Sequence, residues 1–300
     1  MPLRHVLLAL LVVAIWGFNF VVIKLSVEAL PPLLAASLRF FLAALPLVFF
    51  IRPPKAHWLL VTAFGLAFGF GLYAFLNLSM AWGMPAGLSS LVLQVQAFFT
   101  MALAFVMLGE RPSRFQIIGA IIAFAGIGVI AAERLDGASL VPLLMTLLAA
   151  LSWGLATVLT KKAGKVDALS FTVWGALAAP VPLLALSLLV EGPPSVLAAL
   201  AGFSWSDAVL IAFLAYPATL LGGAIWSWLL GRHPATVVAP FTLLVPITGL
   251  LSGYLVLGET ISPIEIAGGL LVIAGLGVTL WRSRPARSDQ DKAARKRATL

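Results

Sequence analysis

One apolar stretch of helix length, which occurs twice, limits the folds open to this chain more than any other feature. The first copy is residues 84–111, MPAGLSSLVLQVQAFFTMALAFVMLGER, with Pro-Ala near its start and Leu-Gly-Glu near its end. The second copy is residues 233–260, HPATVVAPFTLLVPITGLLSGYLVLGET, which has the same motifs at the same positions. The two copies align without a gap at an offset of 149 residues. Each is long enough to cross the hydrocarbon of a bilayer, which takes about 20 helical residues. The chain is therefore predicted to be a duplicated membrane protein.

The composition supports this prediction. The chain is 62% hydrophobic and 10% charged, whereas about 25% of the residues in an ordinary soluble domain are charged. It has no cysteine, which excludes a disulfide framework and a thiol nucleophile. The net charge of +8 comes largely from residues 282–300, which carry seven Lys or Arg and two Asp. A basic segment beside a membrane span is expected on the cytoplasmic side, so we predict no nucleic-acid partner.

Charged residues, prolines and glycines divide the rest of the chain into ten apolar segments. We expect an all-α integral membrane protein with ten transmembrane helices, at about residues 6–24, 33–51, 58–80, 84–111, 115–132, 140–160, 169–190, 207–230, 236–257 and 264–281. If the N-terminus is inside, the inner segments hold 16 of the 19 Lys and Arg residues. Because such a bias sets membrane topology, both termini are predicted to be cytoplasmic.

The duplication extends to both halves of the chain. Trp16, Gly17 and Lys24 reappear as Trp153, Gly154 and Lys161 at an offset of 137 residues. Glycines of the fifth segment reappear in the tenth at the offset of 149. The two offsets, 137 and 149, differ by 12 residues, and the simplest place for this insertion is near residues 191–206. We therefore expect one repeat at residues 1–135, a second at 136–281, and a disordered basic cytoplasmic tail at 282–300. Five spans is an odd number, so the second repeat is predicted to be inverted, as in many transporters.

Several segments carry a resemblance to a known family. Four features resemble EamA-type members of the drug/metabolite transporter superfamily. They are WGFNFVVIK (residues 16–24), SLRFFLAALP (37–46), MPAGLSSLVLQVQAFFT (84–100) and the two Leu-Gly-Glu endings. The fourth segment resembles bacterial exporters of cysteine and O-acetylserine, and aromatic amino-acid exporters belong to the same broad family. The resemblance implies secondary export of a small neutral or zwitterionic metabolite, most simply an amino acid, across a bacterial inner membrane by alternating access, without a cofactor.

Two tryptophans at equivalent positions are the first candidates for a substrate site. Trp16 shares a helix face with Asn19, and Trp153 shares one with Thr157. These faces suit two walls of one cavity, although a tryptophan next to a glycine can also serve only helix packing.

Further polar side chains within the spans are candidates too. Tyr73 and Asn77 follow Gly65 and Gly69 at intervals of four residues on the third segment. Gln94 and Gln96 lie on different faces of the fourth segment, and spacing leaves open which faces the pathway. Arg39 is the one charge clearly inside a span. It could extend to the interface or bind a substrate carboxylate.

Other function classes lack the residues they need. No Asp or Glu lies near the middle of a span, whereas proton-driven exporters of cations use such groups as relays. The chain has no Walker-type phosphate-binding motif, and His5, His57 and His233 lie near span ends, so no metal site is predicted. Export of other metabolites or drugs stays an alternative. An intramembrane enzyme is a distant alternative because no cluster of catalytic groups is evident, and a structural scaffold leaves the inverted duplication unexplained.

Overall fold

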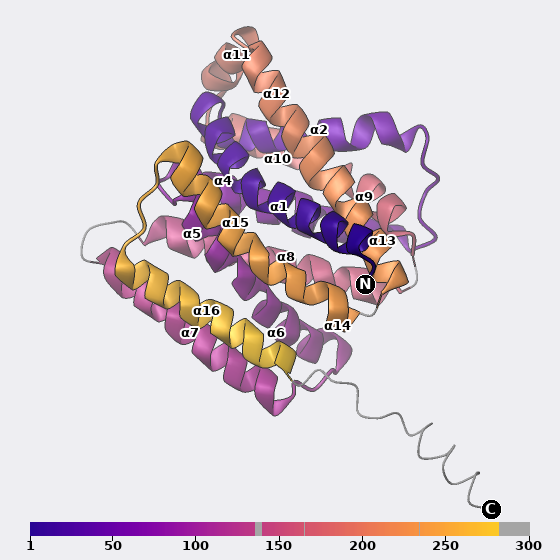
Figure 1. The fold of residues 1–300 in the computed structure, drawn as a ribbon. Coiled ribbons are helices and arrows are strands. Elements are labelled where there is room, and N and C mark those ends of the chain that lie inside the picture. Colours follow the sequence, from indigo (N-terminus) through magenta and orange to yellow (C-terminus); the bar gives the residue numbers. More distant parts are fainter. Residues whose placement is uncertain (136–139, 165, 234, 282–300) are drawn as a thin grey trace, which may run out of the picture.

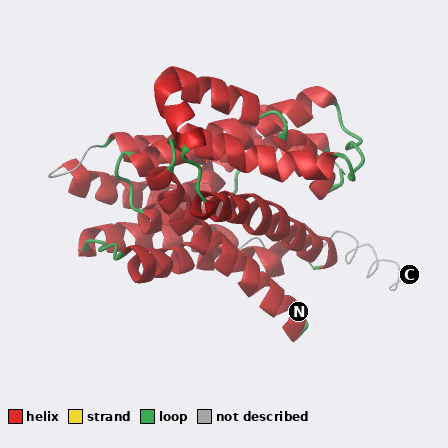
Figure 2. Ribbon diagram, turned by 90° about the horizontal axis from the view of Figure 1, so that it is seen from above, coloured by secondary structure: helices red, strands yellow, loops and turns green. Residues whose placement is uncertain are grey.

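The computed structural model describes residues 1–135, 140–164, 166–233 and 235–281, and these residues form helices joined by loops, without a strand (Figure 1, Figure 2). The predicted tail at 282–300 lies outside the described residues. The first half contains α1 (Leu3–Ala29), α2 (Pro32–Val48), α3 (Trp58–Gly65), the π-helical turn η1 (Leu66–Leu72), α4 (Tyr73–Ala81), α5 (Ala86–Val92), the 3-10 turn η2 (Leu93–Val95), α6 (Gln96–Leu108) and α7 (Arg114–Leu135).

The second half contains α8 (Val141–Ala163), α9 (Ala168–Ala176), α10 (Pro180–Val190), α11 (Pro193–Ala201), α12 (Trp205–Phe213), the π-helical turn η3 (Leu214–Leu221), α13 (Gly222–Arg232), α14 (Ala235–Val238), the 3-10 turn η4 (Ala239–Leu243), α15 (Leu244–Ser252), the π-helical turn η5 (Gly253–Leu257) and α16 (Pro263–Trp281). The short helix α11 was not predicted. It lies where the sequence comparison between the halves placed an insertion.

Seven helical segments among the described residues are long and apolar enough to cross a membrane, which is the pattern of a multi-pass membrane protein. Three further apolar helices are shorter, at Pro32–Leu45, Phe241–Leu257 and Pro263–Thr279. Each of these ten segments overlaps one of the segments expected from the sequence.

The two halves interrupt their helices at equivalent positions. The third segment passes through η1 and resumes as α4 at Tyr73, and the eighth passes through η3 and resumes as α13 at Gly222, which is 149 residues later. The fourth and ninth segments each contain a 3-10 turn and end at a left-handed glycine, Gly109 (φ 71°) and Gly258 (φ 66°). Glycine adopts this conformation without the steric penalty of a Cβ atom. The duplication therefore reaches the local backbone.

Helices α7 and α16 pack side by side along one edge of the bundle (Figure 1). A methyl group on Gly119 would lie 2.4 Å from the carbonyl oxygen of Gly275, and one on Gly126 would lie 2.4 Å from that of Gly268. The order of these contacts makes the helices antiparallel. Gly119 is the equivalent of Gly268, and Gly126 that of Gly275, so each contact is the counterpart of the other, as expected about a local two-fold axis.

This packing gives a test with an internal control. Gly126→Leu is expected to lower the free energy of unfolding by about 1–3 kcal/mol, because overpacking a tight contact displaces its neighbours. Gly128→Leu, two residues along, is expected to have little effect, since nothing lies within 4 Å of a Cβ atom there. Thermal melting of both variants in detergent measures the difference, and equal melting temperatures would contradict the assigned α7–α16 interface.

Two more glycines bring helices together beside the centre of the bundle. A methyl group on Gly17 of α1 would lie 2.9 Å from the backbone nitrogen of Gly249 of α15, and one on Gly154 of α8 would lie 2.9 Å from the backbone nitrogen of Thr100 of α6, the equivalent of Gly249. These contacts are also equivalent in the two halves. They hold the neighbouring Trp16 and Trp153 next to the same central space.

Candidate functional site

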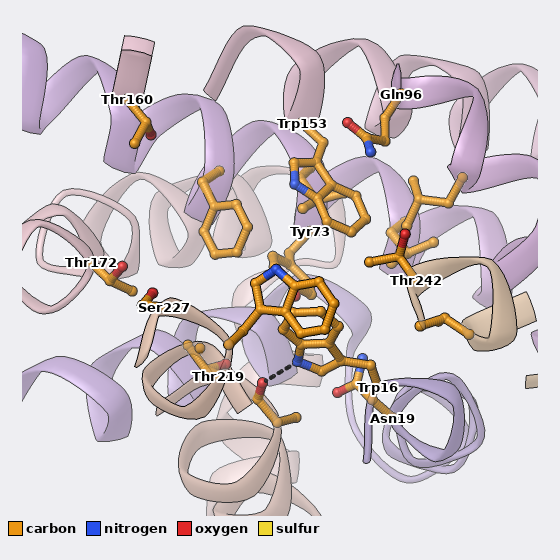
Figure 3. Close-up of a pocket in the computed structure, with 18 of the residues that line it drawn as sticks. Trp16, Asn19, Tyr73, Gln96, Trp153, Thr160, Thr172, Thr219, Ser227 and Thr242 are labelled. Carbon is orange, nitrogen blue, oxygen red and sulfur yellow. Dashed lines mark hydrogen bonds between the residues drawn. The ribbon is translucent and has the colours of Figure 1, made fainter. Parts of the chain in front are cut away.

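A cavity of about 420 Å³ lies inside the bundle (Figure 3). This volume is within the range of about 300–1,000 Å³ that is typical of small-molecule sites. Its walls come from both halves of the chain, and they extend from Trp16 and Trp153 in the middle of α1 and α8 to Thr160 and Ala168, near the end of α8 and the start of α9. The cavity therefore reaches from the centre toward one end of the bundle.

The structure brings most of the predicted site residues to this cavity. Those that line it are Trp16, Asn19, Arg39, Tyr73, Gln94, Gln96 and Trp153. Asn77 and Thr157 are not among the lining residues. The Nδ2 group of Asn77 donates to the carbonyl oxygen of Pro32 at 2.9 Å, and Thr157 donates to the carbonyl oxygen of Trp153 at 3.0 Å and lines a separate cavity. Asn77 thus joins α4 to the start of α2.

Both glutamines line the cavity, although helical spacing had separated them. The turn η2 (Leu93–Val95) explains this result. A 3-10 helix turns by about 120° per residue instead of the about 100° of an α-helix, which brings residues two apart nearer to one face. Gln94 lies within this turn, and Gln96 follows directly after it.

Arg39 is a buried cation in the wall of the cavity. Its side chain is 2% exposed, and its guanidinium carbon lies 4.0 Å from the ring centroid of Tyr73. Nε and Nη2 donate to Oγ1 of Thr219 at 3.1 and 2.9 Å, and Nη2 also donates to the Tyr73 hydroxyl at 2.9 Å. Within the described part of the chain, Nη1 has no hydrogen-bond partner and no carboxylate forms an ion pair with this guanidinium.

A break in the eighth segment positions the partner of Arg39. Pro217 lies inside η3, and because proline lacks an N–H group it removes a bond of the regular helix. Thr219 follows two residues later and donates to the carbonyl oxygen of Leu214 at 2.8 Å, which fixes its oxygen toward Arg39. The sequence analysis did not identify Thr219. A proline inside an apolar span was the available signal.

Aromatic side chains form much of the remaining wall. Figure 3 shows Trp16 and Trp153 entering the cavity from opposite sides. Nε1 of Trp16 donates to the carbonyl oxygen of Ala218 at 3.1 Å, and its ring centroid lies 5.3 Å from that of Trp226 on α13. Trp226 was also missed. It is the equivalent of Asn77 at the offset of 149, so the internal repeat could have indicated it.

One more unpaired polar atom belongs to a residue of the cavity wall. Asn19 lines the cavity and is 7% exposed. Its Oδ1 atom has no hydrogen-bond partner among the residues that the structure describes. The site therefore offers an unpaired cationic donor at Arg39 and an unpaired acceptor at Asn19, between aromatic walls. Among all the residues that the structure describes, no three His, Cys, Asp or Glu residues form a group that could hold a metal ion.

A helical membrane protein with equivalent halves and a central cavity lined by polar and aromatic groups has the architecture of a small-molecule transporter. The chain belongs to the EamA-like transporter family, which it matches over residues 3–132 and 140–281. It is thus a transporter and not an enzyme.

Individual relatives cover almost the whole chain. It is 42% identical to a probable amino-acid metabolite efflux pump of Salmonella typhimurium, over 94% of this chain and 96% of that protein. It is 38% identical to a protein of the same description from Escherichia coli, over 92% and 95% of the two chains. A crystal structure with 19% sequence identity covers 95% of this chain and 99% of its own with a TM-score of 0.59, which shows a shared fold.

Proposed function

We propose that this protein exports amino acids or closely related zwitterionic metabolites, and that the substrate binds in the central cavity. The observation that carries the proposal is the buried guanidinium of Arg39 in the cavity wall, with Nη1 unpaired and without a carboxylate partner among the described residues. The similar efflux pumps, described as acting on amino-acid metabolites, support the same substrate class.

The energetics of a buried charge favour a carboxylate ligand. Removing an arginine from water costs several kcal/mol unless it is paired, and a neutral threonine and tyrosine compensate only in part. A substrate carboxylate would form charge-assisted hydrogen bonds, which are roughly twice as strong as neutral ones. The unpaired Oδ1 of Asn19 is an acceptor for an ammonium group. A zwitterion therefore matches both unpaired atoms of the site.

The aromatic residues complete the match to amino acids that differ in their side chains. Trp16, Trp153 and Trp226 present apolar ring surface, which can accommodate side chains of various shapes. Tyr73, Gln94 and Gln96 supply further polar groups that would orient the substrate. A few polar groups within a mostly apolar wall are typical of sites that bind small molecules.

For the membrane arrangement, we propose ten spans in two inverted five-helix repeats that operate by alternating access. The equivalent helix breaks and the paired glycine contacts of α7 and α16 support the repeats. The location would be a bacterial inner membrane with both termini in the cytoplasm, as the charge distribution predicts.

The orientation can be tested with one introduced cysteine, since the chain has none of its own. A cysteine at position 290 is expected to react with a membrane-impermeant maleimide only after the cells are permeabilised. Labelling in intact cells would contradict a cytoplasmic C-terminus.

The proposed activity can be tested by flux in proteoliposomes. Loaded liposomes are diluted into buffer, and the release of each member of an amino-acid panel is measured without an imposed gradient and then with a pH gradient. We expect release without the pH gradient, because the most buried described carboxylates, Asp207 and Glu265, lie in the first turns of α12 and α16 and not at mid-span. Release only under a pH gradient would refute uncoupled transport, and release of no amino acid would overturn the substrate class.

A further inference from the structure

Equivalent residues hold the two ends of the bundle in different ways. We call the end at which α1 terminates the Lys24 end. There, Nζ of Lys24 donates to the carbonyl oxygen of Met80 at 2.9 Å. The carboxylate of Glu259 accepts hydrogen bonds from the backbone amides of Ala86 and Gly87 at 2.6 and 2.9 Å. These contacts join α1 to α4, and the end of the ninth segment to the start of α5.

The repeat assigns counterparts to all of these groups at the opposite end, which we call the Lys161 end. Lys161 is the equivalent of Lys24, and Glu110 is that of Glu259. The offset of 149 relates Met80 to Leu229 and Ala86 to Ala235. In the structure Lys161 instead donates to the Glu110 carboxylate at 2.5 Å. The two side chains are 57% and 45% exposed.

The cavities follow the same asymmetry. The central cavity extends toward the Lys161 end through Thr160 and Ala168. A second cavity of about 240 Å³ is lined by Glu110 and Lys161 themselves. None of the described residues that close the Lys24 end, Lys24, Met80, Ala86, Gly87 or Glu259, lines either cavity. The contacts at the Lys24 end therefore lie apart from both cavities, whereas the counterpart groups at the Lys161 end are paired differently, where the central cavity approaches that end.

We propose that these four side chains are two alternating latches. In the opposite state of the transporter, Lys24 and Glu259 would pair with each other, as Lys161 and Glu110 do here. Lys161 would then donate to the carbonyl of Leu229, and Glu110 would accept from the amides at the start of the ninth segment. The proposal rests on alternating access in the proposed function and adds the residues that decide which end is open.

This exchange leaves the two states close in energy. Lys24 also lies 3.6 Å from the exposed carboxylate of Glu28. Apart from this ion pair, each state contains one exposed ion pair and one set of charge-assisted hydrogen bonds, so these interactions are exchanged between the ends. An exposed ion pair contributes little to stability, while the latched groups make stronger bonds in a less exposed setting. Two states of similar energy can both be populated, as a transport cycle requires.

The latches can be tested because equivalent substitutions have opposite expected effects. A cysteine is introduced at Leu76, which lines the cavity on α4, and its labelling by a membrane-impermeant maleimide is measured in intact cells. With the predicted orientation, Glu259→Gln weakens the outer latch. It is expected to raise labelling by about tenfold, because one charge-assisted hydrogen bond that holds the outer end closed is lost. Glu110→Gln weakens the latch of the opposite state and is expected to lower labelling by a similar factor.

Matched variants separate this result from a general effect on folding. Glu133→Gln, near the end of α7, removes a carboxylate outside both latches and is expected to change nothing. The double variant Glu110→Gln/Glu259→Gln is expected to return labelling toward that of the parent. If Glu259→Gln does not insert, Lys24→Gln tests the same latch and should act in the same direction.

The outcomes distinguish the latches from the proposed substrate. Opposite shifts of labelling support the latches whichever end faces outward, whereas shifts in one direction or no shift overturn them. Amino-acid flux is measured in parallel with the same variants. Opposite shifts without flux of any amino acid would overturn the proposed substrate and retain the latches. Normal flux with unchanged labelling would overturn the latches alone.

Discussion

Arg39→Gln is expected to weaken transport of amino acids by about 10- to 100-fold, measured as the ratio of maximal rate to half-saturating concentration in proteoliposomes. A hydrogen bond to a charged group contributes about 1.5–3 kcal/mol, and about 1.4 kcal/mol corresponds to a factor of ten. The same variant is expected to transport the corresponding amino-acid amides, which lack the carboxylate, nearly as well as the parent protein does. The loss should therefore depend on the ligand.

Two controls define this experiment. Arg52→Gln changes an exposed arginine beyond the end of α2 and should leave both classes of ligand unaffected. Arg39→Lys keeps the positive charge but loses the planar fork that binds a carboxylate at two points, so a partial recovery is expected. Equal losses for acids and amides would show that Arg39 acts only by holding Tyr73 and Thr219 in place.

Trp16→Ala and Trp153→Ala are each expected to lower transport by at least about tenfold, since truncating a central aromatic anchor typically costs 2 kcal/mol or more in binding. Both side chains line the cavity from opposite sides (Figure 3), so removing either enlarges a space that already exists. Expression and melting temperature are therefore expected to stay near those of the parent. Initial rates across an amino-acid panel measure the effect.

Trp205→Ala is the matched control, because Trp205 is 84% exposed at the start of α12. It is expected to transport normally. If Trp16→Ala and Trp153→Ala both insert and transport at the full rate over the whole panel, these tryptophans only pack helices. The substrate would then bind elsewhere.

The duplication could be followed in detail from the sequence because it preserves local signals. The Pro-Ala and Leu-Gly-Glu motifs marked the start and end of the fourth and ninth segments, and both segments end at a left-handed glycine in the structure. The offset of 149 also identified as equivalent the glycines that the structure shows to meet between α7 and α16. Such features depend on the backbone of one helix or on one tight contact, and residue type alone specifies them.

Side-chain direction was less accessible to sequence reasoning, as the third segment shows. Tyr73 and Asn77 lie one turn apart on α4, yet Tyr73 meets Arg39 in the cavity and Asn77 bonds to the start of α2. Both are buried and polar. Which of them reaches the cavity depends on the rotation of α4 against α2, and a sequence pattern specifies faces only relative to the axis of its own helix.

The sequence by itself determined the membrane class, the positions of the apolar segments, the duplication and seven of the residues that line the cavity, because hydrophobicity, span length and repeated motifs are properties of the chain. Only the tertiary structure decided that Arg39 lacks a carboxylate partner in the described chain, that Thr219 binds Arg39 and Trp226 packs against Trp16, and that Glu259 binds the amides at the start of α5. These features arise where helices from both halves meet. Their geometry depends on contacts between residues up to about 200 positions apart, and no local pattern encodes such contacts.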